Sequence, residues 1–307
     1  MTSGLRIGVD VGGTKIEAIA IDQEGRELAR TRTPAPTGDY NRTLGVIVGL
    51  IAAVEGQAGR QAGAIGIGIP GTISPATKLV KNANSAWLIG HPLDRDLADR
   101  LGRPVRVEND ANCFAVSEAA DGAGAGVAVV FGVILGTGVG GGVVVRGQVL
   151  TGANAIAGEW GHNPLPWPRD TERPGHRCYC GHYGCIETFL SGPGFARDYA
   201  ENTPDAAARV PADIEILAQR GDAAATAALR RYEERLARAL ATVINMLDPD
   251  VIVLGGGMSN TSDLYRAVPR LWTDWVFSDR VDTRLVKAKH GDSSGVRGAA
   301  WLWPVEV

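Results

Sequence analysis

Hydrophobic and polar positions over the first 120 residues follow two alternating periods. Short apolar runs bounded by Gly, Pro or Asp predict buried strands, and apolar residues three or four apart predict helices. Strands that alternate with helices are typical of an α/β layer with a partly parallel sheet. The predicted strands lie at 5–22 (two strands joined by a glycine turn), 27–36, 64–71 and 104–110, and the predicted helices at 41–59, 93–101 and 111–120.

The same pattern starts again at 127–150. Aligning RIGVDVGGTKIEAIAID with FGVILGTGVGGGVVVRG shows one hairpin twice, which indicates an internal duplication of two similar domains. A long helix is predicted over 212–247 and a buried strand with a glycine loop over 251–260. We therefore expect an α/β protein of two domains around a cleft. The expected parts are a smaller domain at 1–120, a larger one at 121–307, and a last helix, about 292–305, that packs back on the first.

Composition narrows the class of protein. The chain has 307 residues, 45% hydrophobic and 21% charged, with a net charge of −3. The basic residues are scattered, so nucleic acid is not expected as a partner. No signal peptide and no apolar run of the ~20 residues that a membrane span needs is seen, so we expect neither a membrane partner nor export. Clustered cysteines then indicate metal ligands in a reducing cytoplasm rather than disulfides.

A cluster of thiols forms the densest chemistry in the sequence. Cys178, Cys180 and Cys185 fall within eight residues, in CYCGHYGCIET, and His162 lies upstream in GEWGHNPLPW. Three thiolates and one imidazole are a usual set for a structural zinc ion. His176 and, less well, His182 are alternatives for the fourth ligand. The remaining cysteine, Cys113, is expected to be a small buried residue.

Two acids flank this cluster. Glu159 precedes His162 by three residues, and Glu187 follows Cys185 by two. A bound zinc ion would fix both carboxylates in place, so we expect a pocket for a polar ligand.

Three glycine-rich loops follow predicted strands and are candidates for binding a nucleotide. Bare backbone N–H groups in such turns bind phosphate oxygens. None of the three matches a Walker A loop or a Rossmann fingerprint, and a single one would be no more than a hairpin turn. The candidate nucleotide-binding residues are Asp10, Gly12, Gly13, Thr14 and Lys15 in the first loop, Gly136, Thr137 and Gly138 in the second, and Gly255, Gly256 and Gly257 in the third.

Two residues of the first loop have expected roles. Asp10 ends the first strand and is expected to hold Mg²⁺ through water, because Mg²⁺ keeps several of its waters. Lys15 lies near the phosphates or is an exposed hairpin lysine.

Asn109 and Asp110 stand where a strand ends and a helix begins. Such a pair can be a helix N-cap. The helix dipole also keeps a carboxylate at this place ionised, which suits the base of a phosphoryl transfer, where it orients the attacking hydroxyl and accepts its proton late. We expect Asp110 to be this base and Asn109 to bind the acceptor.

The motifs DVGGTK, NDAN, LGTGVGGG, GEWGH, CYCGHYGCIE and LGGGMSN together resemble the ROK family (repressor, open reading frame, kinase), in that family's order and over the whole chain. The resemblance implies the actin-like ATPase fold, related to ribonuclease H and duplicated, in a cytoplasmic kinase that uses ATP and Mg²⁺ and holds a structural zinc ion. It implies that Asn109, Asp110, Glu159, His162 and Glu187 contact the sugar, with Asp110 as the base. It also selects His162 over His176 as the zinc ligand beside Cys178, Cys180 and Cys185, with Nδ1 on the metal and the other nitrogen facing the sugar.

Three longer segments, NANSAWL (82–88, with Asn84 as a further sugar-binding candidate), AGEWGHNPLPW and KAKHGDSSGVRGAAWLWP, resemble the fructokinases of this family that also accept mannose. The expected reaction is ATP-dependent phosphorylation of a hexose at its 6-hydroxyl, with D-fructose first and mannose or glucose also possible substrates. N-acetylglucosamine kinases share much of this text and are the alternative. The segment 164–177 between His162 and Cys178 is longer than in the wider family.

Two further expectations follow from the resemblance. The family also includes sugar-sensing repressors, but a helix-turn-helix domain finds no room ahead of a strand that starts near Leu5. The family suggests a homodimer, with a sugar and ATP as the small-molecule partners.

Overall fold

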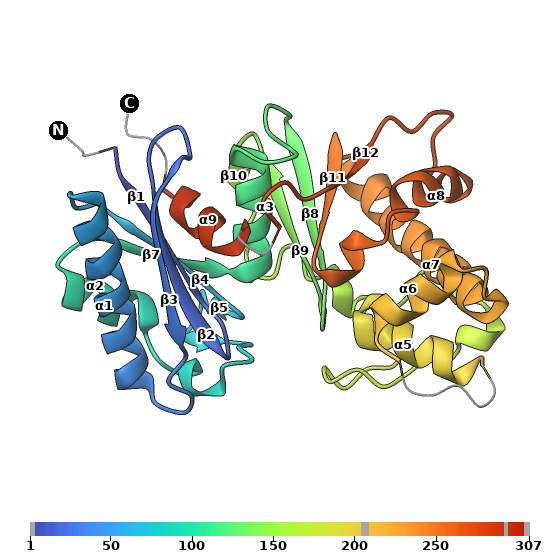
Figure 1. Ribbon diagram of the computed structural model, residues 1–307, viewed down its shortest axis with the longest axis horizontal. Coiled ribbons are helices and arrows are strands. Elements are labelled where there is room, and N and C mark those ends of the chain that lie inside the picture. The colour runs from blue at the N-terminus through green and yellow to red at the C-terminus, as the bar shows by residue number, and fades with distance from the viewer. Residues whose placement is uncertain (1–3, 204–208, 292–293, 304–307) are drawn as a thin grey trace. The chain divides into compact units, whose positions relative to one another are not determined.

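The computed structural model of the chain describes residues 4–203, 209–291 and 294–303 (Figure 1). By contacts, the chain divides into two compact units. Unit 1 takes described residues from Met1–Gly126, Gly142–Ala157 and Asp292–Val307, and unit 2 takes them from Val127–Gly141 and Gly158–Gly291.

Two five-stranded sheets share one strand order. The first runs β3-β2-β1-β4-β7 and the second β10-β9-β8-β11-β12. When the five strands of each sheet are numbered in chain order, both sheets have the spatial order 3-2-1-4-5. In the first sheet β2 is antiparallel to β1 and β3, and β4 is parallel to β1 and β7. The repeated order confirms the predicted α/β class and the duplicated two-domain fold.

The strands have the following bounds: β1 Arg6–Val11, β2 Lys15–Ile21, β3 Glu27–Pro34, β4 Ile65–Ile69, β5 Thr72–Ile73, β6 Val80–Lys81, β7 Val105–Asn109, β8 Val129–Leu135, β9 Val139–Val145, β10 Gln148–Val149, β11 Val251–Gly255 and β12 Arg284–Lys287.

The helices, with η marking 3₁₀ turns, have the following bounds: α1 Tyr40–Ala58, η1 Ala86–Leu88, α2 Leu93–Leu101, α3 Asp110–Ala120, η2 Trp160–His162, η3 Asp170–Glu172, α4 Ile186–Leu190, α5 Gly192–Glu201, α6 Pro211–Gln219, α7 Ala223–Leu247, η4 Gly257–Asn260, α8 Leu264–Leu271, η5 Trp272–Asp274 and α9 Ser294–Trp301.

Helices cover both faces of the first sheet. Helix α1 packs on β2 and β3 with its predicted apolar stripe, while α9 packs on β1 and β4 from the other face (Figure 1). The approach of α9 depends on glycine in the strand, because a Cβ at Gly66 would lie 1.8 Å from the carbonyl oxygen of Ala299. The expected helix at 292–305 is thus present as α9, and its outer residues 292–293 and 304–305 lie outside the described part of the chain.

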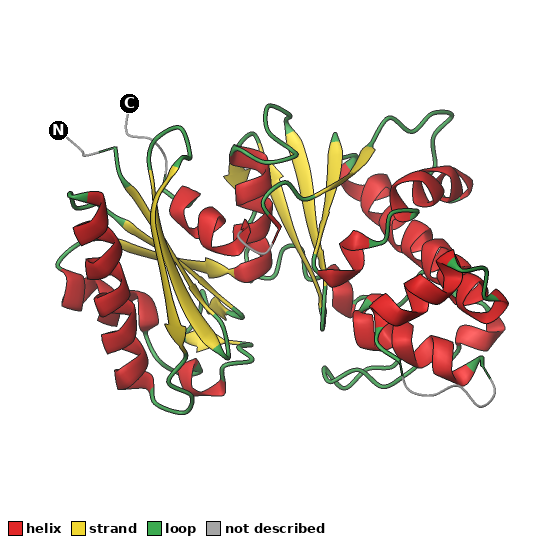
Figure 2. Ribbon diagram, in the orientation of Figure 1, coloured by secondary structure: helices red, strands yellow, loops and turns green. Residues whose placement is uncertain are grey.

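The predicted continuous helix at 212–247 is two helices. Helix α6 ends at Gln219, Gly221 takes a left-handed φ of +86°, and Asp222 caps α7 by accepting the backbone N–H of Ala225. The apolar stripe of α7 is buried at Tyr232, Leu236 and Leu240. In unit 2, helices α5, α6, α7 and α8 gather on one side of β11 and β12 (Figure 2).

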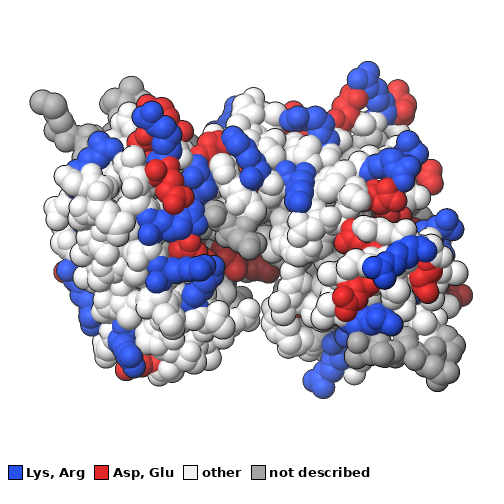
Figure 3. Space-filling model, in the orientation of Figure 1, with Lys and Arg blue, Asp and Glu red and all other residues white. Residues whose placement is uncertain are grey.

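Two further observations concern the surface charges and the helices. On the face drawn in Figure 3, Lys and Arg are interspersed with Asp and Glu. Among the helices within the described residues, none combines the length and the apolar character required to cross a bilayer.

Candidate functional site

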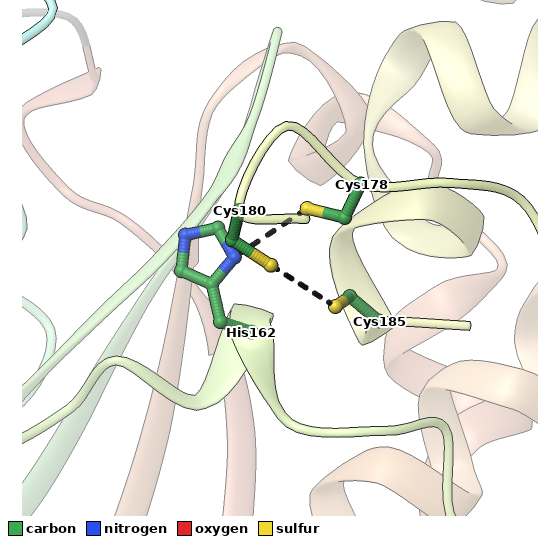
Figure 4. A group of neighbouring side chains, drawn as sticks. All are labelled: His162, Cys178, Cys180 and Cys185. Carbon is green, nitrogen blue, oxygen red and sulfur yellow. Dashed lines mark hydrogen bonds between the residues drawn. The ribbon is translucent and has the colours of Figure 1, made fainter. Parts of the chain in front are cut away.

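Four side chains in unit 2 converge on one point (Figure 4). His162 comes from η2, Cys178 and Cys180 from the following loop, and Cys185 from the start of α4. Their ligand atoms all lie within 4.8 Å of one another, and no other such group of three or more His, Cys, Asp or Glu is found among the described residues. His176 is directed elsewhere, with its Nε2 3.2 Å from Glu201.

The spacing of these atoms fits a tetrahedral zinc ion. His162 Nδ1 lies 3.6 Å from Cys178 Sγ, and Cys180 Sγ lies 3.6 Å from Cys185 Sγ. Ligands at zinc-to-sulfur and zinc-to-nitrogen distances of about 2.3 and 2.0 Å stand about 3.5 to 3.8 Å apart at tetrahedral angles. The set could therefore hold zinc with Nδ1 of His162 as one ligand.

Backbone hydrogen bonds shape the loop that carries the thiols. The N–H of Cys178 donates to His182 O at 2.8 Å, and the N–H of Gly181 donates to Cys178 O at 3.0 Å. The loop is joined to the segment after His162 by Ile186 N–H donating to Asn163 O at 2.8 Å. Few apolar side chains lie in this loop, so a metal ion would contribute directly to its stability.

The carboxylate of Glu187 lies between the thiols and the second glycine loop. This residue is in the first turn of α4. Its Oε2 accepts the backbone N–H of Val139 at 2.9 Å, and its Oε1 lies 3.8 Å from Cys178 Sγ. Glu159, which stands just before η2, is exposed. Both predicted carboxylates thus belong to unit 2 together with the metal-binding set.

Tyr179 is a site residue that the sequence analysis missed. Its hydroxyl lies 2.9 Å from Nε2 of His162, and the two rings meet edge to face with centroids 5.1 Å apart. Partial desolvation, followed by the charges of Glu187 and Glu159, raises the pKa of Tyr179 to about 12, although 77% of the residue is exposed. The phenol therefore keeps its proton at neutral pH. Only its place between two thiol ligands could have indicated it.

A buried ion-pair cluster holds the segment between His162 and Cys178, and it too was missed. Glu172 of η3 accepts hydrogen bonds from Arg235 and Arg238 of α7, both at 2.8 Å. Arg235 also donates to Asp198 of α5 at 2.7 Å, and Arg238 donates to Trp167 O at 2.6 Å. The inserted segment is thereby tied to two helices. Sequence alone gave no sign of this, because the partners lie 63 or more residues away.

In unit 1 the turn from β7 into α3 is organised by Asn109 and Glu108. Asn109 is the N-cap: its Oδ1 accepts the N–H groups of Ala111 and Asn112 at 2.9 and 3.3 Å. The buried Glu108 accepts Asn109 N–H at 2.9 Å and Asn112 Nδ2 at 3.0 Å. Asp110 is the first residue of α3, where its carboxylate meets the positive end of the helix dipole.

Asp10 lies near Asp110, and its carboxyl group is perturbed. Burial and then the charge of Asp110 raise the pKa of Asp10 to about 6, although Lys15 opposes the shift. A cation held between the two carboxylates would lower the pKa of Asp10 again, because a positive charge stabilises the ionised form of both groups. Lys15 itself is exposed and pairs with Glu17 at 3.3 Å. Asn84 lies on an exposed loop of the same unit.

The three glycine loops have different local structures. The first is the β1–β2 hairpin, closed by Gly12 N–H donating to Lys15 O at 2.9 Å. The second joins β8 to β9, with Gly136 N–H donating to Gly138 O at 2.9 Å. The third follows β11, and Gly256 there has a φ of +79°. Unit 1 thus holds the first loop with Asp10, Asn109 and Asp110, and unit 2 holds the other two with Glu159, Glu187 and the thiol set.

Comparison with known proteins adds the following. The model of the ROK family matches residues 6–306. The N-acetyl-D-glucosamine kinase of Vibrio cholerae is 42% identical over 299 residues, which cover 96% of this chain and 98% of that protein. The crystal structure of a ROK hexokinase from Thermus thermophilus has a TM-score of 0.84 at 31% identity and covers 97% of both chains. A ROK family glucokinase from Streptomyces griseus, in complex with glucose and AMPPNP, has a TM-score of 0.77 at 30% identity and covers 97% of this chain and 98% of its own.

Proposed function

The chain belongs to the ROK family and is a sugar kinase, and we propose that it transfers the γ-phosphoryl group of ATP to the 6-hydroxyl of N-acetyl-D-glucosamine. The observation that carries the choice of sugar is the 42% identity to the Vibrio cholerae kinase over nearly the full length of both chains. It favours the alternative of the sequence analysis over fructose, which was expected first. Fructose stays a second candidate because of the resemblance in NANSAWL and AGEWGHNPLPW.

In this proposal Asp110 is the base. It orients the 6-hydroxyl and accepts its proton, and its place in the first turn of α3 supports an ionised state at neutral pH. The residues that bind the sugar in this proposal are Asn84, Asn109, Glu159, His162 and Glu187. The hydrogen bonds that Oδ1 of Asn109 accepts from the N–H groups of Ala111 and Asn112 would hold its side chain in one orientation.

The nucleotide would bind through the three glycine loops. Their backbone N–H groups suit phosphate oxygens, and Thr14, Lys15 and Thr137 add polar side chains. Asp10 would hold Mg²⁺ through water, and the ion supplies charge neutralisation for the phosphates when bound. A zinc ion held by His162, Cys178, Cys180 and Cys185 would have a structural role. It would fix the loop that immediately precedes Glu187.

The first experiment is a panel of sugars with ATP and Mg²⁺. We expect kcat/KM to be highest for N-acetyl-D-glucosamine among N-acetyl-D-glucosamine, glucose, mannose and fructose. A higher kcat/KM for fructose would overturn the proposed acceptor while leaving the kinase assignment intact. No transfer to any of the four would contradict the proposed substrate class.

The second experiment tests the base. Asp110→Asn keeps the size of the side chain and removes its basicity, so we expect kcat to fall by about 10³-fold or more while calorimetry shows the sugar still binding. The exposed Asp99 of α2 provides the matched control, because Asp99→Asn makes the same chemical change away from the candidate site. Wild-type kcat in Asp110→Asn would refute the assignment of the base.

A further inference from the structure

Glu108 is a buried carboxylate that has no part in the reaction as proposed above. It lies in β7, directly before the turn formed by Asn109 and Asp110, and it is 6% exposed. Its recorded partners are three neutral donors, and among the described residues no Lys, Arg or His forms an ion pair with it. Burying a charge is costly unless hydrogen bonds compensate it, so this carboxylate depends on the three donors.

The two oxygens of Glu108 bind different segments of unit 1. Oε1 accepts the backbone N–H of Asn109 at 2.9 Å and Nδ2 of Asn112 at 3.0 Å, on either side of Asp110 in the sequence. Oε2 accepts the hydroxyl of Thr151 at 3.1 Å, from a segment 43 residues further along the chain. Oε1 therefore joins the end of β7 to the first turn of α3, and Oε2 joins both to the segment after β10.

The segment that carries Thr151 is itself fixed within unit 1. The N–H of Ala157 donates to Thr151 O at 3.2 Å, which closes residues 151–157 into a loop. Lys81 of β6 donates from Nζ to Asn154 O at 2.8 Å, and α3 packs beside β10, where the loop starts. Thr151 thus approaches Glu108 from a support that does not depend on the turn between β7 and α3.

The side chain of Asn109 is occupied by other contacts. Its Oδ1 caps α3, and its Nδ2 donates to Gly71 O at 3.3 Å. Asp110 is the first residue of α3, so the backbone on both sides of it sets the direction of its carboxylate. Glu108 binds this backbone on one side, at the N–H of Asn109, and the side chain of Asn112 on the other.

We propose that Glu108 is a positioning residue for phosphoryl transfer: through its three hydrogen bonds, its carboxylate fixes the turn that carries Asp110. This inference rests on the proposed function, in which Asp110 orients the 6-hydroxyl and accepts its proton. A displacement of about 1 Å in such a group can cost about 10²-fold in rate, so the reaction benefits from a turn held at three points. Glu108 contacts neither the sugar nor the nucleotide in this role.

Two substitutions separate the hydrogen bonds of Glu108 from its size. In Glu108→Gln, Oε1 can still accept the N–H groups of Asn109 and Asn112, and Nε2–H can donate to the hydroxyl oxygen of Thr151, which is free to rotate. We therefore expect kcat within about 2-fold of wild type. The side chain in Glu108→Met has a similar length and accepts none of these bonds, so we expect kcat to fall about 10- to 100-fold, with the KM for ATP within about 2-fold.

Glu55→Met is the matched control for lost stability. Glu55 of α1 is also 6% exposed in unit 1, and it accepts the backbone N–H of Ala62 at 2.8 Å. Its replacement removes a buried carboxylate outside the turn, so we expect a lower urea midpoint with kcat unchanged. Wild-type kcat in Glu108→Met, or equal losses of kcat in the two Met variants, would overturn the inference. A Glu108→Gln variant as slow as Glu108→Met would also overturn it, because the hydrogen bonds alone would then not restore activity.

Thr151→Val tests the same contact with a smaller change. It keeps the shape of the side chain and removes the donor to Oε2 of Glu108, so we expect kcat to fall about 3-fold or more. Should Glu108→Met fail to fold, wild-type kcat in Thr151→Val would overturn the inference in its place.

The kinetics of Asp110→Asn keep the two proposals apart. Loss of activity in Asp110→Asn together with wild-type kcat in Glu108→Met would overturn the positioning role alone. Wild-type kcat in Asp110→Asn would refute the base, and with it the role of Glu108 in positioning that base.

Discussion

Replacing Glu172 by glutamine tests whether the inserted segment stabilises unit 2. The side chain of Glu172 is 4% exposed, and those of Arg235 and Arg238 are 9% and 1% exposed. Glu172 receives three close hydrogen bonds from them, at 2.8, 2.8 and 2.9 Å, and a fourth from the backbone N–H of Arg169 at 2.8 Å. The amide of glutamine keeps the volume but removes the negative charge between two guanidinium groups.

The expected cost is large because one partner of a buried ion pair is removed. Breaking such a pair costs about 3 to 5 kcal/mol, since the remaining charge is left uncompensated in a poorly solvated place. Asp198 still pairs with Arg235, whereas Arg238 keeps, among the described residues, the carbonyl oxygens of Pro166 and Trp167 as acceptors. We therefore expect Glu172→Gln to lower the free energy of unfolding of unit 2 by about 3 kcal/mol.

The loss should depend on pH. Burial alone raises the pKa of Glu172, but the hydrogen bonds from Arg235, Arg169 and Arg238 outweigh it and lower the pKa. A carboxyl whose folded-state pKa is lowered stabilises the protein above its unfolded pKa of about 4.3, and this stability is lost as the pH falls through the folded value. The difference between wild type and variant should be complete at pH 7 and shrink below pH of about 4.

Urea unfolding at pH 7 measures the effect, and the same short helix supplies the control. Asp170 is 98% exposed and pairs with Arg173 on the surface, so Asp170→Asn should cost less than about 1 kcal/mol. A loss below about 1 kcal/mol in Glu172→Gln, or equal losses in the two variants, would refute the claim that this cluster holds the segment.

Two further predictions concern Asp10 and the thiols. A carboxyl whose pKa is raised to about 6 stabilises the fold at low pH, and that stability is lost as the pH rises from about 4 through about 6. Asp10→Asn should therefore raise the free energy of unfolding by up to about 3 kcal/mol at pH 7.5 and barely change it at pH 4. The same variant should abolish Mg²⁺-dependent transfer. Equal shifts of the urea midpoint at the two pH values would contradict the raised pKa of Asp10 as the cause. Cys180→Ser should lower zinc content and stability together, whereas Cys113→Ser, in the buried core of unit 1, should lower stability and leave zinc unchanged; unchanged zinc by elemental analysis in Cys180→Ser would rule out the metal set.

Local pattern was sufficient to predict most elements. The helix predicted at 41–59 is α1, Tyr40–Ala58, because its apolar spacing coincides with a capping Asp39 before it and a left-handed Gly59 after it. The duplication was visible because each hairpin repeats both its strand periods and its glycine turn. The break between α6 and α7 was missed because an apolar stripe with helical period can continue across a short turn such as the one at Gly221.

Contacts between distant segments were not visible in the sequence. The thiol set was found because three of its members fall within eight residues. The ion pairs of Glu172 with Arg235 and Arg238 were not predicted, because a charged residue in a loop usually remains solvated. Only the folded structure shows that these side chains are buried. Tyr179 was overlooked for a related reason, since its contact with His162 is visible only in the folded structure.

The second glycine loop shows why the candidate metal set and the proposed nucleotide-binding loop of unit 2 should respond together. A Cβ at Gly138 would lie 2.7 Å from Oε2 of Glu187, so glycine there leaves room for the carboxylate. That oxygen accepts the N–H of Val139, and the other oxygen lies 3.8 Å from Cys178 Sγ. Glu187 therefore joins the thiol loop to the β8–β9 turn through its two oxygens. If the loop relaxes when the metal is lost, the turn loses the acceptor for Val139, and binding of the nucleotide should weaken along with binding of the sugar.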